Sequence, residues 1–245
     1  MNIKQSTRSY EKWVREHISV VDADLKRKHE GMALDMLFFL RATFYRWAQT
    51  FPETCPELIS APSVLSVGDL HFENYGTWRD SEGRLNWGVN DFDECSYLPY
   101  TNDIVRLLTS TKVAIRTGRL DMKVKEACRL VLKGYVQGLQ EGGHPFVLAE
   151  GHDELRRIAV ARLKHPGEFW AKLDENKPPR ATVPPACIRV LQNALPEPQM
   201  DYRLLQRQSG AGSLGRQRIV AIAEWHGGRV AREAKATLPS AWLWA

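Results

Sequence analysis

Residues 66–94 read SVGDLHFENYGTWRDSEGRLNWGVNDFDE and contain the polar cluster around which the fold is expected to form. The apolar runs 63–67 and 85–89 on either side of this cluster have the composition of short strands. The polar stretch 79–84 between them is typical of a turn. Carboxylates follow both runs directly. The sequence therefore predicts a set of oxygen ligands for a hard divalent cation at the strand ends.

The spacing within this stretch is more informative than its composition. Asp69 and Asn74 are five residues apart, and Asp91 and Asp93 follow within the next twenty. The kinase pattern H-R-D-x-x-x-x-N separates its catalytic Asp and metal-binding Asn by the same interval, and a metal-binding Asp comes later in D-F-G. In phosphoryl transfer one carboxylate orients the attacking hydroxyl, while an amide oxygen and a second carboxylate bind Mg²⁺. The alternative is a pair of Asp-rich turns that cap strands and helices.

A second motif lies near the C-terminus, where Gly210, Gly212 and Gly215 spell G-x-G-x-x-G after a strand-like run. In a dinucleotide-binding fold this loop would open a helix and precede an acid. Here a β-branched strand and a turn at 227–228 follow, and Lys235 stands 20 residues after Gly215. That order is typical of the nucleotide-covering hairpin of kinases, in which backbone N–H groups approach phosphates. The alternative is a glycine-rich hairpin with a surface lysine.

Length and composition set broad limits. The 245 residues, 43% of them hydrophobic, allow one large domain or two small ones with an ample core. The net charge of +5 suits a phosphate-bearing ligand and would also suit nucleic acid, but the basic residues are dispersed. The four cysteines form no C-x-x-C pair, which argues against a zinc site or a disulfide framework. No signal-peptide core or membrane-length apolar run is present, so we expect a cytoplasmic protein without a membrane partner.

Composition also predicts four segments in an α+β chain. Residues 1–30 are polar and end in a basic run at 26–30, which we expect to be a solvated helix face. Residues 31–172 contain the predicted helices and both acidic motifs. Residues 173–200 are rich in proline and predict a linker, and residues 201–245 contain the glycine hairpin.

Several helices are predicted from periodicity. The dense apolar stretch 32–47 predicts a single helix buried on more than one side, with Arg41 in its middle. Arg41 would either pair with a carboxylate of the acidic loops or extend its charge into water. Three later helices are expected over 103–118, 123–140 and 153–164. The positions expected on the buried face of the first of these are Ile104, Leu107, Leu108 and Ala114.

The segments GDLHFENYGTW, NDFDE, GAGSLG and REAKA resemble a bacterial family, the domain of unknown function 2252 group, over most of residues 32–235. Its motifs are similar to the H-G-D-L-H-x-x-N and I-D-F-D segments of aminoglycoside and choline phosphotransferases. The resemblance implies a protein-kinase-like fold with a mainly helical large lobe and a C-terminal β-hairpin fragment of the small lobe. Because the glycine loop follows the acidic motifs here, it also implies a circular permutation.

The resemblance implies a role for individual residues. Asp69 would be the catalytic base, and Asp103 would brace the catalytic loop. His71 matches the second His of H-G-D-L-H, where a catalytic role and a packed, hydrogen-bonded imidazole fit equally. The Mg²⁺ ligands would be Asn74, Asp91 and Asp93. The residues around the ATP phosphates would be Gly210, Gly212, Ser213, Gly215 and Lys235.

The chain departs from the kinase pattern after Lys235. A kinase lysine normally pairs with a Glu on the next helix, and only ten residues follow Lys235 here. The apolar end at 242–245 predicts either a truncated chain or a protein partner that covers it.

These observations leave several functions open. The leading prediction is an ATP- and Mg²⁺-dependent phosphotransferase acting on an unknown small-molecule or protein hydroxyl. The same nucleotide-binding and metal-binding residues would serve a nucleotidyl transferase in which the nucleotide binds in the reverse orientation. The absent Glu partner favours a pseudokinase-like regulatory module that binds nucleotide without turnover. A metal-dependent phosphoester hydrolase would use the Asp, His and Asn cluster alone, and nucleic-acid binding rests only on net charge.

Overall fold

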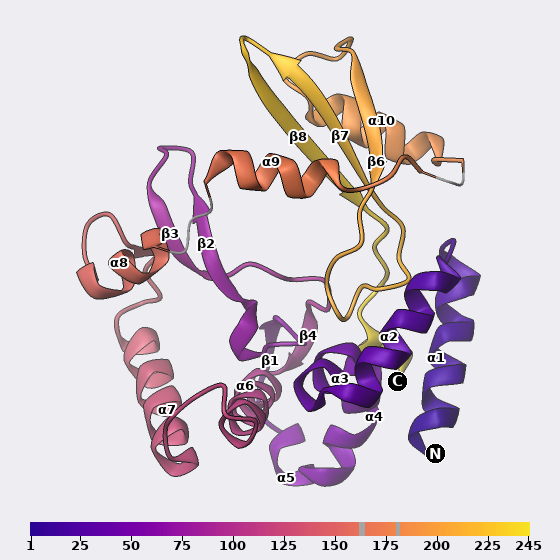
Figure 1. Ribbon diagram of the computed structural model, residues 1–245. Coiled ribbons are helices and arrows are strands. Elements are labelled where there is room, and N and C mark those ends of the chain that lie inside the picture. The colour runs from indigo at the N-terminus through magenta and orange to yellow at the C-terminus, as the bar shows by residue number, and fades with distance from the viewer. Residues whose placement is uncertain (162–164, 180–181) are drawn as a thin grey trace. The chain divides into compact units, whose positions relative to one another are not determined.

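The computed structural model describes residues 1–161, 165–179 and 182–245 (Figure 1). The chain combines helices with short strands in antiparallel sheets, which confirms the α+β class. The α-helices are α1 (Ile3–His17), α2 (Asp22–Leu34), α3 (Met36–Ala42), α4 (Phe44–Thr54), α5 (Pro56–Ile59), α6 (Thr101–Arg116), α7 (Val124–Gln140), α8 (Asp153–Ala161), α9 (Pro166–Asp174), α10 (Pro185–Ala194) and α11 (Ala241–Trp244), with a 3₁₀ turn, η1, at Phe72–Asn74. The strands are β1 (Ser63–Ser66), β2 (Tyr75–Arg79), β3 (Leu85–Val89), β4 (Ser96–Pro99), β5 (Phe146–Val147), β6 (Tyr202–Gln206), β7 (Arg218–Trp225) and β8 (Gly228–Lys235).

The chain forms two compact units, each assembled from separate stretches. Unit 1 comprises Met1–Tyr10, Met32–Leu163 and Pro239–Ala245, and unit 2 comprises Glu11–Gly31 and Lys164–Leu238. These bounds differ from the four predicted segments. Residues 1–30 divide between the units, and the predicted linker at 173–200 lies within unit 2, where it supplies α10.

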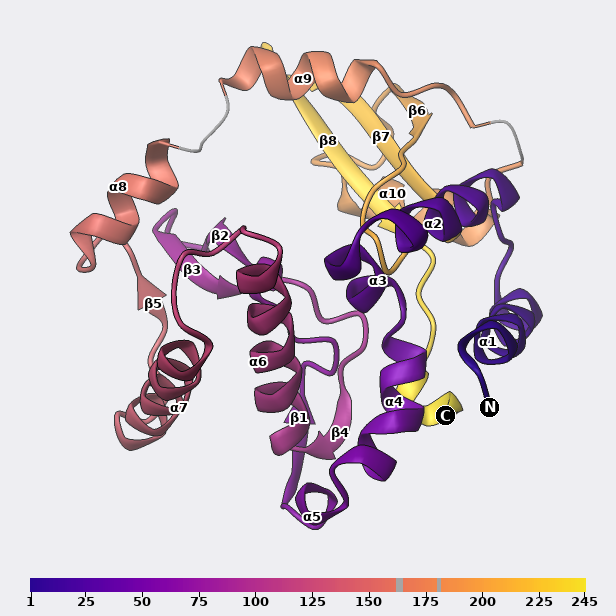
Figure 2. The same ribbon diagram turned by 60° about the horizontal axis from the view of Figure 1, so that its bottom comes forward.

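Unit 2 is built on the antiparallel sheet β6-β7-β8, with β7 in the centre. The run Ile219 to Ala223 is buried throughout because helices cover both faces of this strand. Val220 and Ile222 pack with α9, whereas Ile219 and Ala221 pack with α10 (Figure 2). The predicted order of strand, glycine loop, strand, tight turn and strand is confirmed, with Arg218 opposite Lys235.

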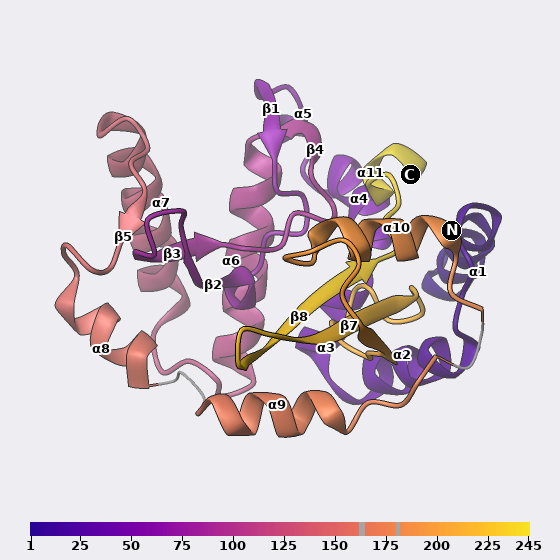
Figure 3. The same cartoon turned by 90° about the horizontal axis from the view of Figure 1, so that it is seen from above.

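Unit 1 contains the two predicted strands and further strands that pair with them. The runs around β1 and β3 are strands, but β1 pairs with β4 and not with β3. The polar turn connects β3 to β2, a strand that the prediction missed, and β5 adds to the other edge of β3 (Figure 3). Residues 96–99, for which no strand was predicted, form β4. The β-forming residues of β2, including Tyr75 and Trp78, explain its pairing.

The apolar stretch 32–47 is not the single helix that was predicted. Asp35 has an extended backbone and its Oδ1 accepts the N–H of Phe38 at 2.6 Å, which begins α3. Thr43 is also non-helical and separates α3 from α4. Later helices match the prediction to within a few residues, although residues 162–164 of the third lie outside the described part of the chain. No helix in the described ranges is long and apolar enough to cross a membrane.

The tryptophan-rich end of the chain packs within unit 1. The ring of Trp244 meets Tyr10 edge-on at 5.1 Å between centroids and lies 6.2 Å from Tyr45, while Trp242 lies 6.5 Å from Phe51. Only Leu243 among these residues is a strongly exposed hydrophobic side chain, at 71%. Both tryptophan rings therefore have aromatic neighbours within unit 1, and the expectation of a truncated chain or a covering partner stays a prediction.

Candidate active site

The loop that carries Asp69 depends on Gly68. This glycine has φ of +85°, and a Cβ at the position would lie 2.2 Å from the carbonyl oxygen of Glu94. The start of α6 fixes the loop, because the carboxylate of Asp103 accepts the N–H of Val67 at 2.7 Å and that of Gly68 at 2.9 Å. The expectation that Asp103 braces this loop is confirmed.

The side chain of Asp69 pairs with Arg106 of α6. Nε and Nη2 of Arg106 both donate to Oδ1 of Asp69, at 2.9 and 2.6 Å. Burial raises the pKa of Asp69 to about 7, against the lowering effect of the Arg106 guanidinium. A carboxylate with a pKa near neutrality can accept a proton during a reaction at physiological pH.

Asn74 lies against the same loop. Its Nδ2 donates to the carbonyl oxygen of Asp69 at 2.8 Å, and the side chain is 4% exposed. The register of the β2–β3 hairpin then places Asn74 opposite Asn90, whose N–H donates to the carbonyl oxygen of Asn74 at 3.1 Å. Asp91 follows Asn90 directly. The hairpin therefore brings the Asp69 loop and the N-D-F-D segment together through Asn74.

The predicted metal ligands are suitable in kind for Mg²⁺. Asn74, Asp91 and Asp93 supply an amide oxygen and two carboxylates, which are hard donors. Asp91 is exposed, and its Oδ1 accepts the N–H of Asp93 at 3.3 Å. Within the described ranges, no group of three or more His, Cys, Asp or Glu side chains is arranged to bind a metal ion. Metal binding by these residues therefore stays a prediction.

His71 is a buried, neutral imidazole. It is 3% exposed, and its Nδ1 has no hydrogen-bond partner among the residues that the structure describes. Burial, with the nearby charges of Arg41 and Arg106, lowers the pKa of His71 to about 3. An imidazole with so low a pKa is a weak base at neutral pH, which favours the packed alternative over the catalytic one. The catalytic role of His71 stays a prediction.

The structure shows that Arg41 pairs with a carboxylate, which was one of the two alternatives left open by the sequence. Its Nη1 pairs with the carboxylate of Glu73, in the acidic loop, and Nη1 of Arg119 lies 3.5 Å from the other oxygen of Glu73. Arg119 also pairs with Asp35 at the start of α3. These contacts connect α3, the Asp69 loop and the end of α6 around one rim.

The glycine loop of unit 2 packs against α2. A Cβ on Gly215, which has φ of +96°, would lie 2.6 Å from Cδ2 of Leu25. Nζ of Lys28 donates to the carbonyl oxygen of Gly212 at 3.0 Å, and the N–H of Val21 donates to that of Gly215 at 2.9 Å. Lys28 is only 6% exposed, so the prediction of a fully solvated basic run at 26–30 is wrong at this residue. Close packing against α2 is a role for Gly215 that the sequence did not indicate.

Basic side chains gather on one face of the sheet beside this loop. Arg218 and Lys235 are opposite each other in register and so project from the same face. Arg207 and Arg218 donate to the carboxylate of Glu233 at 2.7 and 2.5 Å. Arg218 also donates to Oγ of Ser213 at 3.0 Å. Two guanidinium groups thus share the single carboxylate of Glu233, and the positive charge of this face suits a phosphate.

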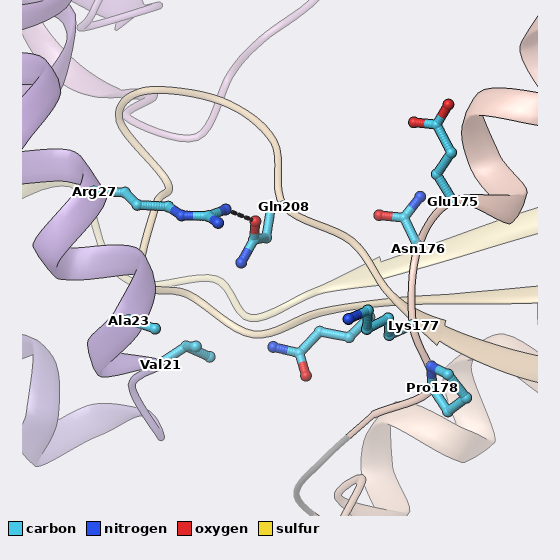
Figure 4. Close-up of a pocket in the computed structure, with 9 residues that line it drawn as sticks. Val21, Ala23, Arg27, Glu175, Asn176, Lys177, Pro178 and Gln208 are labelled. Atoms are coloured by element: carbon cyan, nitrogen blue, oxygen red, sulfur yellow. Dashed lines mark hydrogen bonds between the residues drawn. The ribbon is translucent and has the colours of Figure 1, made fainter.

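A polar pocket of about 350 Å³ lies at the base of the same loop (Figure 4). Arg27 of α2 donates to Oε1 of Gln208 on one side of it, and Asn176 and Lys177 line the other side. None of the residues predicted to bind nucleotide lines this pocket.

Two buried side chains near Asp69 were missed by the sequence-based prediction. Arg106 is 1% exposed and Asn102 is fully buried. Nδ2 of Asn102 donates to the carbonyl oxygen of Gly68 at 3.0 Å, and its Oδ1 accepts Nε1–H of Trp47 at 2.9 Å. The available signal was their spacing, because Asn102, Arg106, Ser110 and Ala114 recur every four residues on one face of α6.

Comparison with protein-family models matches residues 20–163 to the family described as uncharacterized protein conserved in bacteria, DUF2252. The matched span contains the Asp69 loop and the N-D-F-D segment and ends before the glycine loop. No curated protein and no solved structure matches the chain. The kinase-like part of the resemblance stays a prediction. Because the match covers more than half of the 245 residues, the chain belongs to the DUF2252 family of bacterial proteins.

Proposed function

We propose that this protein is a kinase-like phosphotransferase that uses ATP and magnesium to phosphorylate a hydroxyl group. The observation that carries the proposal is the arrangement of Asp69. One of its oxygens is fixed by Arg106, its main chain is fixed by Asn74, and its side chain keeps 17% exposure. A carboxylate anchored in this way is suited to orient an attacking hydroxyl.

In this proposal Asp69 accepts the proton of the acceptor hydroxyl. The hydroxyl oxygen forms a bond to the γ-phosphorus of ATP, the bond from that phosphorus to its bridging oxygen breaks, and ADP leaves. The raised pKa of Asp69, about 7, supports this role because a general base is most effective when its pKa is near the working pH.

Asn74, Asp91 and Asp93 are the residues that would bind Mg²⁺. Their oxygen donors are of the type this ion prefers, and the hydrogen bond from Nδ2 of Asn74 to Asp69 leaves the amide oxygen Oδ1 as the ligand atom. The ion would neutralise charge on the phosphate oxygens.

In unit 2, Lys235 and the loop residues Gly210, Gly212, Ser213 and Gly215 would contact the nucleotide phosphates. The positive charge of Arg207, Arg218 and Lys235 on one sheet face supports an anionic ligand there. A permuted kinase-like architecture would account for the position of this hairpin after the acidic motifs.

A second candidate function is metal-dependent phosphoester hydrolysis by unit 1 alone. The packing of Gly215 against Leu25 favours it, because α2 explains this glycine without any nucleotide. Under this alternative, substitution of Lys235 would leave activity and ligand binding unchanged.

The test is thermal stabilisation by ATP, measured with and without Mg²⁺. We expect Mg²⁺ and ATP together to raise the melting temperature of the wild type, and Asp91→Ala and Lys235→Ala each to remove most of that rise. Asp121→Ala and Lys172→Ala are matched controls, since both side chains are exposed. ADP release from Mg·ATP, with water as the acceptor of the phosphoryl group, is then measured on the same proteins.

Each result has a defined meaning. Absence of stabilisation in the wild type would remove the support for nucleotide binding. Stabilisation without ADP release would favour a regulatory module. Cleavage of a phosphoester such as p-nitrophenyl phosphate that is sensitive to Asp91→Ala but not to Lys235→Ala would favour the hydrolase.

A further inference from the structure

Arg106 is one of the largest fully buried side chains in the described ranges, at 1% exposure. It lies on the inner face of α6, four residues after Asn102 and four before Ser110. A guanidinium remains charged at any physiological pH, so a buried one needs a counter-charge and a complete set of hydrogen-bond acceptors. The other residues on this helix face are small or neutral and polar, so the buried charge of Arg106 needs a specific explanation.

The guanidinium is held by two neighbouring helices of unit 1. Its Nη2 donates to the carbonyl oxygen of Leu40 near the end of α3, at 2.5 Å. Its Cζ lies 5.5 Å from the ring centre of Phe44 and 4.9 Å from that of Trp47, both in α4. Cation–π contacts and a main-chain acceptor together leave the group little freedom to turn.

The contact with Asp69 is asymmetric. Both donors, Nε and Nη2, bind Oδ1, instead of binding one oxygen each as in the common bidentate arrangement. No hydrogen bond joins Oδ2 to any residue within the described ranges, and Asp69 is not fully covered, at 17% side-chain exposure. Oδ1 is therefore occupied from inside the unit, and Oδ2 is the oxygen left for a group arriving from solvent.

The main chain on either side of Asp69 is fixed as well. The carbonyl oxygen of Gly68 accepts Nδ2–H of Asn102, and that of Asp69 accepts Nδ2–H of Asn74. Because the backbone is anchored at both residues, rotation about the χ angles of Asp69 is the conformational freedom that remains to this side chain. The bonds from Arg106 remove it.

We infer that Arg106 is a positioning residue for the proposed phosphotransfer, which turns Asp69 so that Oδ2 alone meets the acceptor hydroxyl. This inference rests on the proposed function and adds to it. Arg106 contacts Asp69 and touches neither the acceptor nor the phosphate. Its effect is on the orientation of the base.

The alternative is a purely structural ion pair. In that case substitution of Arg106 would lower stability, and any loss of turnover would follow the fraction of unfolded protein. A positioning role instead predicts that turnover falls in the protein that remains folded. Measurements at a temperature well below the melting point of each variant separate these two outcomes.

The experiment compares the wild type with Arg106→Lys, Arg106→Gln and the matched control Arg116→Lys, an exposed residue on the same helix. Steady-state ADP release from Mg·ATP is measured for each, with water as the acceptor of the phosphoryl group. We expect Arg106→Gln to lower kcat about 10- to 100-fold with KM for ATP unchanged, because the lost effect is on a general base. Arg106→Lys, which restores one donor and the charge, should recover part of kcat. Arg116→Lys should behave as the wild type.

A double-mutant cycle for the stability of Arg106→Gln, Asp69→Asn and the double variant tests the contact without relying on activity. Non-additive shifts of the urea midpoint are expected. Additive shifts, or unchanged kcat in folded Arg106→Gln, would overturn the inference while leaving the phosphotransferase proposal intact. A wild type that neither binds Mg·ATP nor releases ADP would overturn the proposed function itself, and with it the role of Arg106.

Discussion

Asp69 and Arg106 lie 37 residues apart in the chain and meet as a largely buried ion pair. Burying two charges costs free energy that their attraction only partly offsets, so such a pair adds little net stability. Removing one partner is different, because it leaves the other charge buried and unpaired, at a cost of about 3–5 kcal/mol. The pair therefore specifies an arrangement of the loop more than it stabilises the fold.

The raised pKa of Asp69 makes its contribution to stability depend on pH. The ordinary pKa of this carboxyl is 3.8 and its pKa in the folded chain is about 7, so between these values the folded state keeps a proton that the unfolded state has lost. The stability contributed by this group therefore falls as pH rises through that interval. We expect the unfolding free energy of the wild type, relative to Asp69→Asn, to decrease by a few kcal/mol from about pH 4 to about pH 7.5 in urea titrations.

His71 provides the matching control with the opposite slope. Its pKa is lowered to about 3 from 6.5, so the folded state binds fewer protons than the unfolded state between those values. The stability of the wild type relative to His71→Gln should therefore rise with pH up to about pH 6.5. If neither difference in unfolding free energy, for Asp69→Asn or for His71→Gln, changes with pH, then neither group has the environment described.

Within the elements, the turn after β1 depends on a single glycine. Gly68→Ala places a Cβ 2.2 Å from a carbonyl oxygen in a left-handed backbone conformation, so both a clash and a conformational penalty apply. We expect a loss of about 3 kcal/mol or more in the free energy of unfolding, measured by urea denaturation.

Gly118→Ala is the matched comparison. Gly118 has φ of +71°, and a Cβ added there would meet no atom within 4 Å, so only the conformational penalty applies. Its cost should be about 1–2 kcal/mol. Equal costs for the two variants would show that the close approach of Glu94 to Gly68 is not rigid.

Element by element, local signals identified most of the strands and helices. The Gly227 turn and the β-branched run of β7 were sufficient to predict the C-terminal hairpin, because both are local features. The pairing of β1 with β4 was not predictable, since nothing in the run 63–67 distinguishes one partner strand from another. The inner face of α6 was assigned correctly only at Ala114, because a pattern of leucines such as Leu107 does not reveal a buried Arg.

The same limit applies to the candidate site. Asp69, Asn74 and Asp103 were found because their types and spacing follow a known chemical pattern. Arg106 has no such pattern, and its role depends on a contact across 37 residues. The involvement of α2 with the glycine loop was equally inaccessible, since Lys28 and Gly212 are separated by 184 residues.

Across the whole molecule, unit 1 is assembled from both ends of the chain as well as its middle. The contacts of Trp244 with Tyr10 and Tyr45 join these ends to α4. We expect Trp244→Ala to lower the free energy of unfolding by about 2–4 kcal/mol, because it removes a large aromatic surface from these rings.

Leu243→Ala is the control for that substitution. The neighbouring side chain is 71% exposed, so its removal should change stability by no more than about 0.5 kcal/mol. The measurement is urea denaturation followed by tryptophan fluorescence. Equal effects of the two substitutions would contradict the packing described for the last helix.

The buried ammonium of Lys28 has a practical consequence for chemical labelling. An amine-acetylating reagent reaches a lysine only when solvent does, and Lys28 is covered while it donates to Gly212. Acetylation at this one lysine, followed by mass spectrometry over time, would thus record how often α2 separates from the glycine loop. The more exposed Lys26 of the same helix would supply the internal reference rate.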